Sequence, residues 1–154
     1  MTIEQHLKQA VEQASTYSKE KSDSMGEVFT PFKLIKEMVM KIPSETRLDP
    51  NKTWFDPCAG KGNFQVVIVT MLMMAHEELF PDRYERYKHI MENQMYMGEF
   101  QPESAAFIEE TFNPRGDLKL NLYVGDTLQM PGDFFDLSYE ERFEKYPQHC
   151  VKGV

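Results

Sequence analysis

The ten residues from 55 to 64 constrain most strongly what this chain can fold into. A short hydrophobic stretch ends at Asp56, and a turn with two glycines, Gly60 and Gly62, follows it. Glycine lets the backbone reach dihedral angles that other residues resist, and it lets a ligand approach the main chain. The long apolar stretch from Asn63 predicts a helix whose free N–H groups point at this turn. The pattern therefore indicates a nucleotide-like pocket at the carboxyl end of a parallel strand.

The spacing of the glycines separates this turn from two other phosphate-binding turns. No third glycine follows Gly62 at the interval of the dinucleotide fingerprint, and no Gly-Lys-Ser/Thr sequence follows either. Residues 56–64, Asp-Pro-Cys-Ala-Gly-Lys-Gly-Asn-Phe, instead resemble the S-adenosylmethionine motif of amino-methylating DNA methyltransferases, especially the adenine-specific ones. Cys58-Ala59 reverses the more usual order, and Lys61 stands where serine or threonine is commoner. The alternative is a tight strand-to-helix turn that binds nothing.

A Phe-Thr-Pro element upstream of the glycine turn extends this resemblance. Thr30 is expected to cap a helix with Pro31 at its first position, and apolar residues at helical spacing continue until Pro43 ends the helix. In the family, the same element, which here begins at Phe29, packs over the methionine end of the cofactor. An ordinary capped helix without a ligand role is the alternative.

Two further acids follow the next two predicted strands. Residues 95–99 predict a short buried strand that ends at Glu99, and apolar alternation over residues 118–124 predicts a third strand followed by Gly-Asp126. An acid at the end of the second strand is placed to accept hydrogen bonds from a ribose. The resemblance implies that Glu99 binds the cofactor ribose and that Asp126 binds the adenine amino group. A surface glutamate and a plain Gly-Asp turn are the alternatives.

These elements predict an α/β protein with the Rossmann-like fold of S-adenosylmethionine-dependent methyltransferases. We expect this fold in truncated form, with a mainly parallel sheet in strand order 3-2-1. Thr2 and Gln5 form a capping-box pattern at the first helix. Helices are expected over residues 3–20, 64–80, 81–92, from 102 onward and over 138–145. We divide the chain into an N-terminal helix and loop (1–25), an S-adenosylmethionine-binding domain (26–130) and an aromatic, acidic tail (131–154).

Composition narrows the classes of function. The net charge of −8 gives no basic face of the kind that holds duplex DNA unaided. No apolar run reaches membrane length, and the N-terminus has no signal-peptide pattern, so we expect no membrane association. Two cysteines without zinc-like spacing suit a cytoplasmic protein with reduced thiols. We therefore expect no metal ligands.

The resemblance lacks the element that acts on a target base. In the adenine enzymes a fourth strand is followed by Asp/Asn-Pro-Pro-Tyr/Phe, which grips the flipped base. This chain contains no Pro-Pro pair, so we assign no catalytic residue. Three functions stay open: the cofactor half of a fragmented or split adenine-specific enzyme, a stand-alone S-adenosylmethionine-binding accessory or regulatory protein, and a methyltransferase acting on a small molecule or a protein.

Strand order 3-2-1 would leave the first strand, with Trp54 and Phe55, at an open edge of the sheet. An open apolar edge invites pairing with another strand. The tail, a second copy in a homodimer or a different protein could cover it, and residues 150–154 could begin a covering strand. DNA contact is expected through a missing segment or a partner subunit. The resemblance implies S-adenosylmethionine as cofactor and the following cofactor-binding residues: Phe29, Thr30, Pro31, Asp56, Pro57, Ala59, Gly60, Gly62, Asn63, Phe64, Glu99 and Asp126.

Overall fold

A computed structural model describes residues 2, 5–13 and 30–151 of the chain. Its centre is a three-stranded parallel sheet in the order β1 (Trp54–Asp56), β2 (Met95–Glu99), β3 (Asn121–Val124). The predicted order 3-2-1 is this order seen from the other edge, so the expected α/β class and sheet order are confirmed. The bounds of β2 agree with the sequence prediction.

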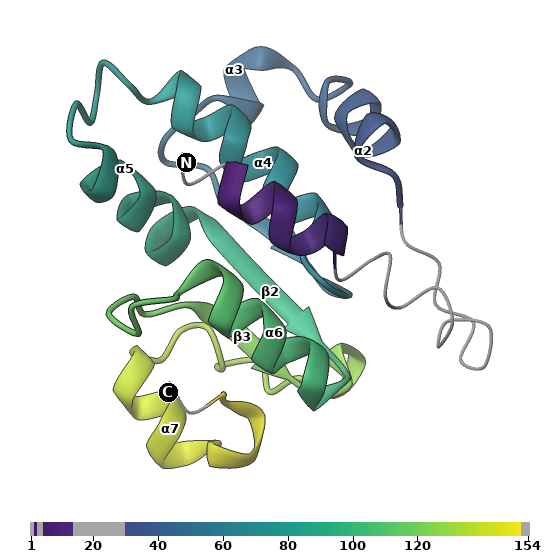
Figure 1. Ribbon diagram of the computed structural model, residues 1–154. Coiled ribbons are helices and arrows are strands. Elements are labelled where there is room, and N and C mark those ends of the chain that lie inside the picture. Colours follow the sequence, from purple (N-terminus) through teal and green to yellow (C-terminus); the bar gives the residue numbers. More distant parts are fainter. Residues whose placement is uncertain (1, 3–4, 14–29, 152–154) are drawn as a thin grey trace.

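Helices fill both connections between the parallel strands (Figure 1). α4 (Asn63–Ala75) and α5 (Arg83–His89) lead from β1 toward β2, and the π-helical turn η1 (Ile90–Gln94) continues α5. α6 (Pro102–Phe112) joins β2 to β3. Apolar side chains of α4, α6 and β2 pack in one buried cluster, which includes Val66, Val69, Leu72, Met95, Met97, Ala105, Ile108 and Phe112. This packing fixes the carboxyl ends of the strands relative to the start of each helix.

Two helical boundaries differ from the sequence predictions. α4 ends at Ala75, short of residue 80, because buried His76 takes the C-cap position and its Nε2 lies 3.0 Å from Gln94 Oε1. The next helix begins later than expected, at Arg83, because the Asp82 side chain accepts a hydrogen bond from the backbone N–H of Glu85 and so caps it.

The N-terminal helix and α2 lie on the α4 side of the molecule. Residues 5–13 are helical, and the predicted capping box is present: Thr2 N donates to Gln5 Oε1 (2.9 Å), and Gln5 N donates to Thr2 Oγ1 (3.2 Å). Leu7 and Val11 of this helix are buried in the main core. Figure 1 shows the helix running beside α4. Residues 3, 4 and 14–20 of the expected helix lie outside the described residues.

The predicted cap of the next helix is wrong in detail. α2 spans Phe32–Val39, so Pro31 is its extended N-cap residue, and no side chain caps it. The Thr30 carbonyl instead accepts a hydrogen bond from Asn63 Nδ2 at 3.0 Å, which ties this residue to the glycine turn. The helix ends at Val39 with Met40 as its C-cap residue, and it therefore stops short of Ile42 and Pro43. Pro43 then opens a short helix, α3 (Ser44–Arg47), that we did not predict.

The tail packs on the face of the sheet opposite to α4 and α6. η2 (Thr127–Gln129) precedes the tail, which contains α7 (Tyr139–Lys145) and η3 (Pro147–His149), and the predicted helix over 138–145 is confirmed with a Ser138–Glu141 capping box. Phe134 is fully buried and meets the Tyr123 ring edge-on at 5.0 Å. This contact buries the Tyr123 ring, which stands between the alternating apolar residues of the third strand.

A buried arginine completes the contact between the tail and the sheet. Arg142 Nη1 of α7 donates to Asn121 Oδ1 of β3 at 3.0 Å, and the guanidinium lies 5.4 Å from the Phe135 ring. Burial lowers the pKa of this guanidinium. Because the tail packs against the sheet, all four residues of β3 are buried. The alternation of buried apolar and exposed polar residues that was expected for this strand is therefore not found.

The β1 edge of the sheet is open in the described part of the chain. β1 pairs with β2, and no other described strand pairs with it. Phe55 is 50% exposed although its ring meets Phe135 of the tail at 5.8 Å. Cys150 and Val151 form no strand beside β1, and residues 152–154 lie outside the described residues. The predicted open edge is therefore present.

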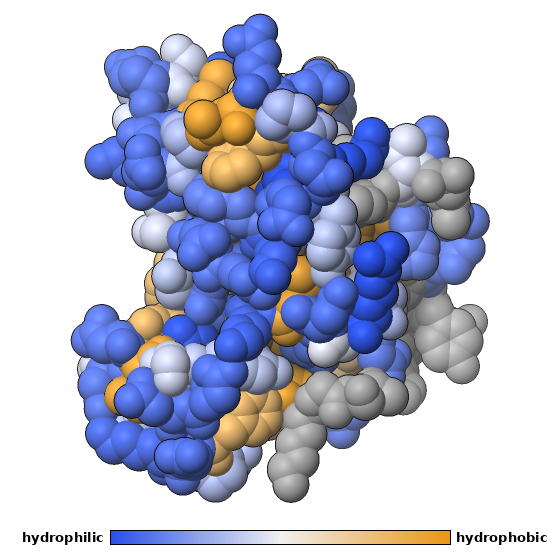
Figure 2. Space-filling view, turned by 90° about the vertical axis from the view of Figure 1, so that its left-hand side faces the viewer, coloured by the Kyte–Doolittle hydropathy of each residue, from blue (hydrophilic) through white to orange (hydrophobic). Residues whose placement is uncertain are grey.

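Figure 2 shows a mostly hydrophilic face on which hydrophobic side chains lie in separate areas. Among the described residues, no helix combines the length and the apolar character needed to cross a membrane.

Candidate cofactor site

The glycine turn has the backbone conformation that its sequence predicts. Gly60 and Gly62 have φ angles of +57° and +93°, in the left-handed region that favours glycine. Gly62 also lies close to α6, because a Cβ atom there would come 2.6 Å from the Phe112 ring. Both positions therefore exclude larger residues, and Gly62 places the first turn of α4 directly after the turn.

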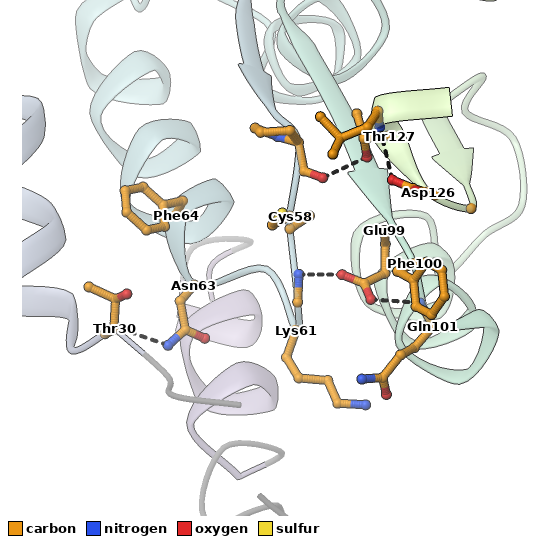
Figure 3. Close-up of a pocket in the computed structure, with 15 residues that line it drawn as sticks. Thr30, Cys58, Lys61, Asn63, Phe64, Glu99, Phe100, Gln101, Asp126 and Thr127 are labelled. Carbon is orange, nitrogen blue, oxygen red and sulfur yellow. Dashed lines mark hydrogen bonds between the residues drawn. The ribbon is translucent and has the colours of Figure 1, made fainter. Parts of the chain in front are cut away.

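Glu99 holds the glycine turn to the end of β2 (Figure 3). Its Oε2 accepts from the backbone N–H of Gly60 at 2.7 Å, and its Oε1 accepts from the N–H of Gln101 at 2.8 Å. Ala59 N also donates to the Gly98 carbonyl at 2.9 Å. These two bonds orient the Glu99 carboxylate at the border between β2 and the glycine turn.

The loop after β3 borders the same space from the other side. Gly125 N donates to the Glu99 carbonyl at 2.9 Å, and Asp126 Oδ1 accepts from Leu128 N at 3.0 Å, which caps η2. The Thr127 hydroxyl donates to the Pro57 carbonyl at 2.7 Å. Beneath this loop, burial raises the pKa of the Tyr123 phenol, and the nearby charge of Asp126 raises it further.

These elements enclose a cavity of about 770 Å³ at the carboxyl ends of the strands. Eight of the predicted site residues line it: Thr30, Pro57, Ala59, Gly60, Asn63, Phe64, Glu99 and Asp126. Pro31 and Gly62 do not line it but adjoin residues that do. Phe29 lies outside the described residues.

Asp56 has a different position from the other acids. Its Oδ1 accepts from the backbone N–H of Cys58 and its Oδ2 from Gln65 Nε2, both at 3.0 Å. The carboxylate thus bends the chain into the glycine turn and ties it to α4. Asp56 lines a second, mainly apolar groove of about 350 Å³ beside β1, together with Met38, Val39, Ile42, Trp54, Phe55, Pro57, Phe64, Ile68 and Met95. Pro57 and Phe64 border both spaces.

Sequence reasoning missed several residues of the cavity wall. Phe100 and Leu128 are large apolar side chains that are 70% and 91% exposed, and both line the cavity. Phe100 directly follows Glu99, and Leu128 lies two residues after Asp126. Their positions next to predicted ligand acids could have identified them. Cys58, Lys61, Gln101, Gly125 and Thr127 also line the cavity.

The cavity carries charges of both signs, which suits a ligand with hydroxyl or amino groups and with both positive and negative charge. Glu99 and Asp126 supply two carboxylates, while the ammonium of Lys61 lies 5.2 Å from the Phe107 ring. The start of α4 adds the positive end of a helix dipole near the glycine turn. Among the described residues, no three histidine, cysteine or acidic side chains are grouped to hold a metal ion. The arrangement is suited to binding and orienting a nucleoside-like ligand.

The parallel sheet and its connections have the Rossmann-like fold of a methyltransferase domain. A model of the N-6 DNA methylase family matches residues 9–133, which is more than half of the 154 residues. The chain therefore belongs to the N-6 DNA methylase family, and the resemblance seen in its sequence motifs is confirmed. No curated protein matches the chain.

Proposed function

We propose that this chain binds S-adenosylmethionine and forms the cofactor-binding part of an adenine-specific DNA methyltransferase. The observation that carries the proposal is the meeting of three separate segments at one cavity: the glycine turn, Glu99 and Asp126. Family membership supports a DNA methyltransferase role. Residues 26–130 then form the cofactor-binding unit, the described part of the tail, residues 131–151, supports it from the opposite face of the sheet, and the protein acts in the cytoplasm.

The lining residues match the parts of the cofactor. Glu99, held by two backbone N–H groups, accepts from the ribose hydroxyls. Asp126 accepts from the adenine amino group, and the exposed rings and chains of Phe100 and Leu128 cover the faces of the base. The two carboxylates also favour a ligand with an ammonium and a sulfonium group. The cofactor supplies an activated methyl group, and the residues of this chain bind and orient it.

Pro57 and Phe64 suggest where the methyl acceptor approaches. They line both the cavity and the groove beside β1, so a molecule in the groove is separated from the cofactor only by this wall. Asp56, at the end of the groove, is held by Cys58 N and Gln65 Nε2 and shapes the wall.

Titration calorimetry with S-adenosylmethionine and S-adenosylhomocysteine tests the proposal directly. Replacing Gly60 with valine should abolish measurable binding, because φ is +57° there. Glu99→Ala should weaken binding by about 1–3 kcal/mol, since polar groups of the ligand lose their partner. Glu103→Ala, at an exposed acid on α6, is the matched control and should bind normally. A folded protein that binds neither ligand at millimolar concentration would contradict the proposal.

The two cysteines provide a second measurement. Cys58 lines the cavity and is exposed, whereas Cys150 is partly buried in the tail. Bound cofactor should slow alkylation of Cys58 by iodoacetamide and leave the rate at Cys150 unchanged. Equal rates at Cys58 with and without saturating ligand would place the ligand elsewhere.

A stand-alone S-adenosylmethionine-binding accessory protein is the second candidate. The net charge of −8 favours it, because this chain has no basic footprint of the kind that holds duplex DNA. Under both candidates the purified chain should transfer no tritiated methyl group to unmethylated DNA. Transfer that Asp56→Ala abolishes would show that this chain alone holds a complete active site.

We further propose that a strand from a second copy or a partner subunit covers the β1 edge. β1 pairs only with β2 among the described strands, and the apolar groove lies beside it. In the DNA-methylating assembly, the same partner would carry the contact with DNA. Light scattering over a concentration series should show self-association, and a strict monomer at high concentration would leave only the hetero-partner form.

A further inference from the structure

The loops after β1 and β3 are joined directly, although β2 lies between them. The Thr127 hydroxyl donates to the Pro57 carbonyl at 2.7 Å, across 70 positions of sequence. Figure 3 shows this bond crossing from one wall of the cavity to the other. Both residues line the cavity, and each is adjacent to a lining residue with a polar side chain, Cys58 on one side and Asp126 on the other.

Gly98 on β2 makes this crossing possible. A Cβ atom at Gly98 would lie 2.6 Å from Thr127 Oγ1 and 3.2 Å from the Pro57 carbonyl oxygen. Gly98 is not among the glycines with positive φ, so its backbone conformation does not require glycine. The position is instead restricted by the close approach of the hydroxyl and the carbonyl above it.

Other hydrogen bonds tie each loop to β2 but not to the opposite loop. Ala59 N donates to the Gly98 carbonyl and Gly125 N to the Glu99 carbonyl, both at 2.9 Å. These bonds fix the height of each loop above the sheet. The bond from Thr127 to Pro57 adds a lateral restraint, which sets the separation of the two walls.

We propose that Thr127 is a positioning residue that holds the two walls of the cavity at the separation that the cofactor requires. This inference rests on the proposed function for its ligand, but the restraint itself can be measured without one. A site held in its bound geometry binds more tightly because less ordering remains to be done on binding. Loss of the hydroxyl should therefore weaken binding more than it weakens the fold.

The experiment compares Thr127→Val, Thr127→Ser and Gly98→Ala with the unchanged chain. Thr127→Val removes the hydroxyl and keeps the branched shape, Thr127→Ser restores the hydroxyl, and Gly98→Ala forces the crossing atoms apart. Gly132→Ala is the matched glycine control, because a Cβ atom there has no neighbour within 4 Å. Calorimetry with S-adenosylhomocysteine, hydrogen exchange of the amides of residues 58–62 and the thermal midpoint are measured for each variant.

We expect Thr127→Val and Gly98→Ala to weaken binding on the order of tenfold, the equivalent of one lost hydrogen bond. Amide exchange over residues 58–62 should become faster in both variants. The thermal midpoint of Thr127→Val should stay within the range of the Gly132→Ala control. Thr127→Ser should restore both binding and protection. Unchanged affinity in Thr127→Val would overturn the inference.

The exchange measurement separates this inference from the cofactor proposal. If the unchanged chain binds no ligand, the cofactor proposal fails, and the restraint is judged by exchange alone. Faster exchange in Thr127→Val, restored by serine, then supports the restraint. Unchanged exchange overturns it. A thermal midpoint that falls in parallel with the affinity would also overturn it, because Thr127 would then act on the whole fold.

Discussion

The two edges of the sheet differ in what covers them. At β3 the tail covers one face and the outer edge, and Tyr139 and Phe143 of α7 line a small pocket with Leu120 and Leu122. At β1 the sequence is equally apolar, yet Phe55 is half exposed and a groove remains beside the strand. The difference shows that a hydrophobic strand does not determine its own cover. Burial depends on what the rest of the chain places next to it.

The largest loss of stability should follow from a substitution on the β3 side of the sheet, which the tail covers. Phe134→Ala removes a fully buried ring that packs against Tyr123, and it should lower the free energy of unfolding by about 3–5 kcal/mol. Phe100→Ala, at an exposed ring, should change it by less than about 0.5 kcal/mol. Urea denaturation of both variants measures the difference. Similar values for the two would mean that the tail does not stabilise the sheet.

A smaller effect on the same side should follow from removing the buried guanidinium. Arg142→Met leaves Asn121 Oδ1 without its 3.0 Å donor in a buried position, which should cost about 1–3 kcal/mol. Lys41→Met, at an exposed lysine near the open side, is the control and should be nearly neutral. Urea denaturation compares the two, and an Arg142→Met variant as stable as its control would contradict the assigned role.

A substitution at the open β1 edge should change the stability of the isolated chain far less. Phe55→Ala should lower the free energy of unfolding by about 1 kcal/mol or less, because the ring is half exposed before the change. Phe55→Lys should in addition reduce self-association seen by light scattering, because a charged residue blunts a strand edge. A loss of stability as large as that of Phe134→Ala would show that β1 is covered after all.

The smallest effect should appear on acidification and should begin in the tail. A hydrogen bond from Lys145 lowers the pKa of Asp133, one from Lys119 lowers that of Glu140, and the Ser138 backbone N–H lowers that of Glu141. Because the folded pKa values are depressed, these groups stabilise the fold above the ordinary carboxyl pKa of about 4. That stabilisation is lost as the pH falls through the folded values.

Tail docking should therefore weaken below about pH 4 before the β1 side changes. Near-ultraviolet circular dichroism of the tail aromatic side chains follows it. Asp133→Asn should reduce the pH dependence of this signal, and Asp82→Asn, which affects the α5 cap instead, should not. An unchanged pH dependence of the signal in Asp133→Asn would show that Asp133 does not contribute to the weakening of tail docking.

Local patterns in the sequence were sufficient for much of the fold. Glu99 ends its strand where predicted, Pro102 begins α6, and Ser138 caps α7. Each of these features depends on residues close together in sequence. The burial of Asn121 and Tyr123 was missed because it depends on the tail, whose Arg142 and Phe134 reach back to β3 from a later part of the chain.

Some features of the candidate site could likewise be predicted from local sequence, and others could not. Strand ends and the glycine turn indicated Gly60, Glu99 and Asp126, which the fold brings to one cavity. The bond between Thr127 and Pro57 could not be predicted, because it requires knowledge of which strands are neighbours and of how closely two loops cross Gly98. Thr30 was predicted as a helix cap, but its carbonyl meets Asn63 instead.

The position of Trp54 gives the open edge an optical reporter. It is the single tryptophan of the chain, and it lines the groove beside β1 together with Pro57 and Phe64. Indole emission moves to shorter wavelength when water is excluded from the ring, so intrinsic fluorescence should register any strand or acceptor that enters the groove, without a label. Light emitted by this one side chain thus distinguishes an occupied edge from a bare one.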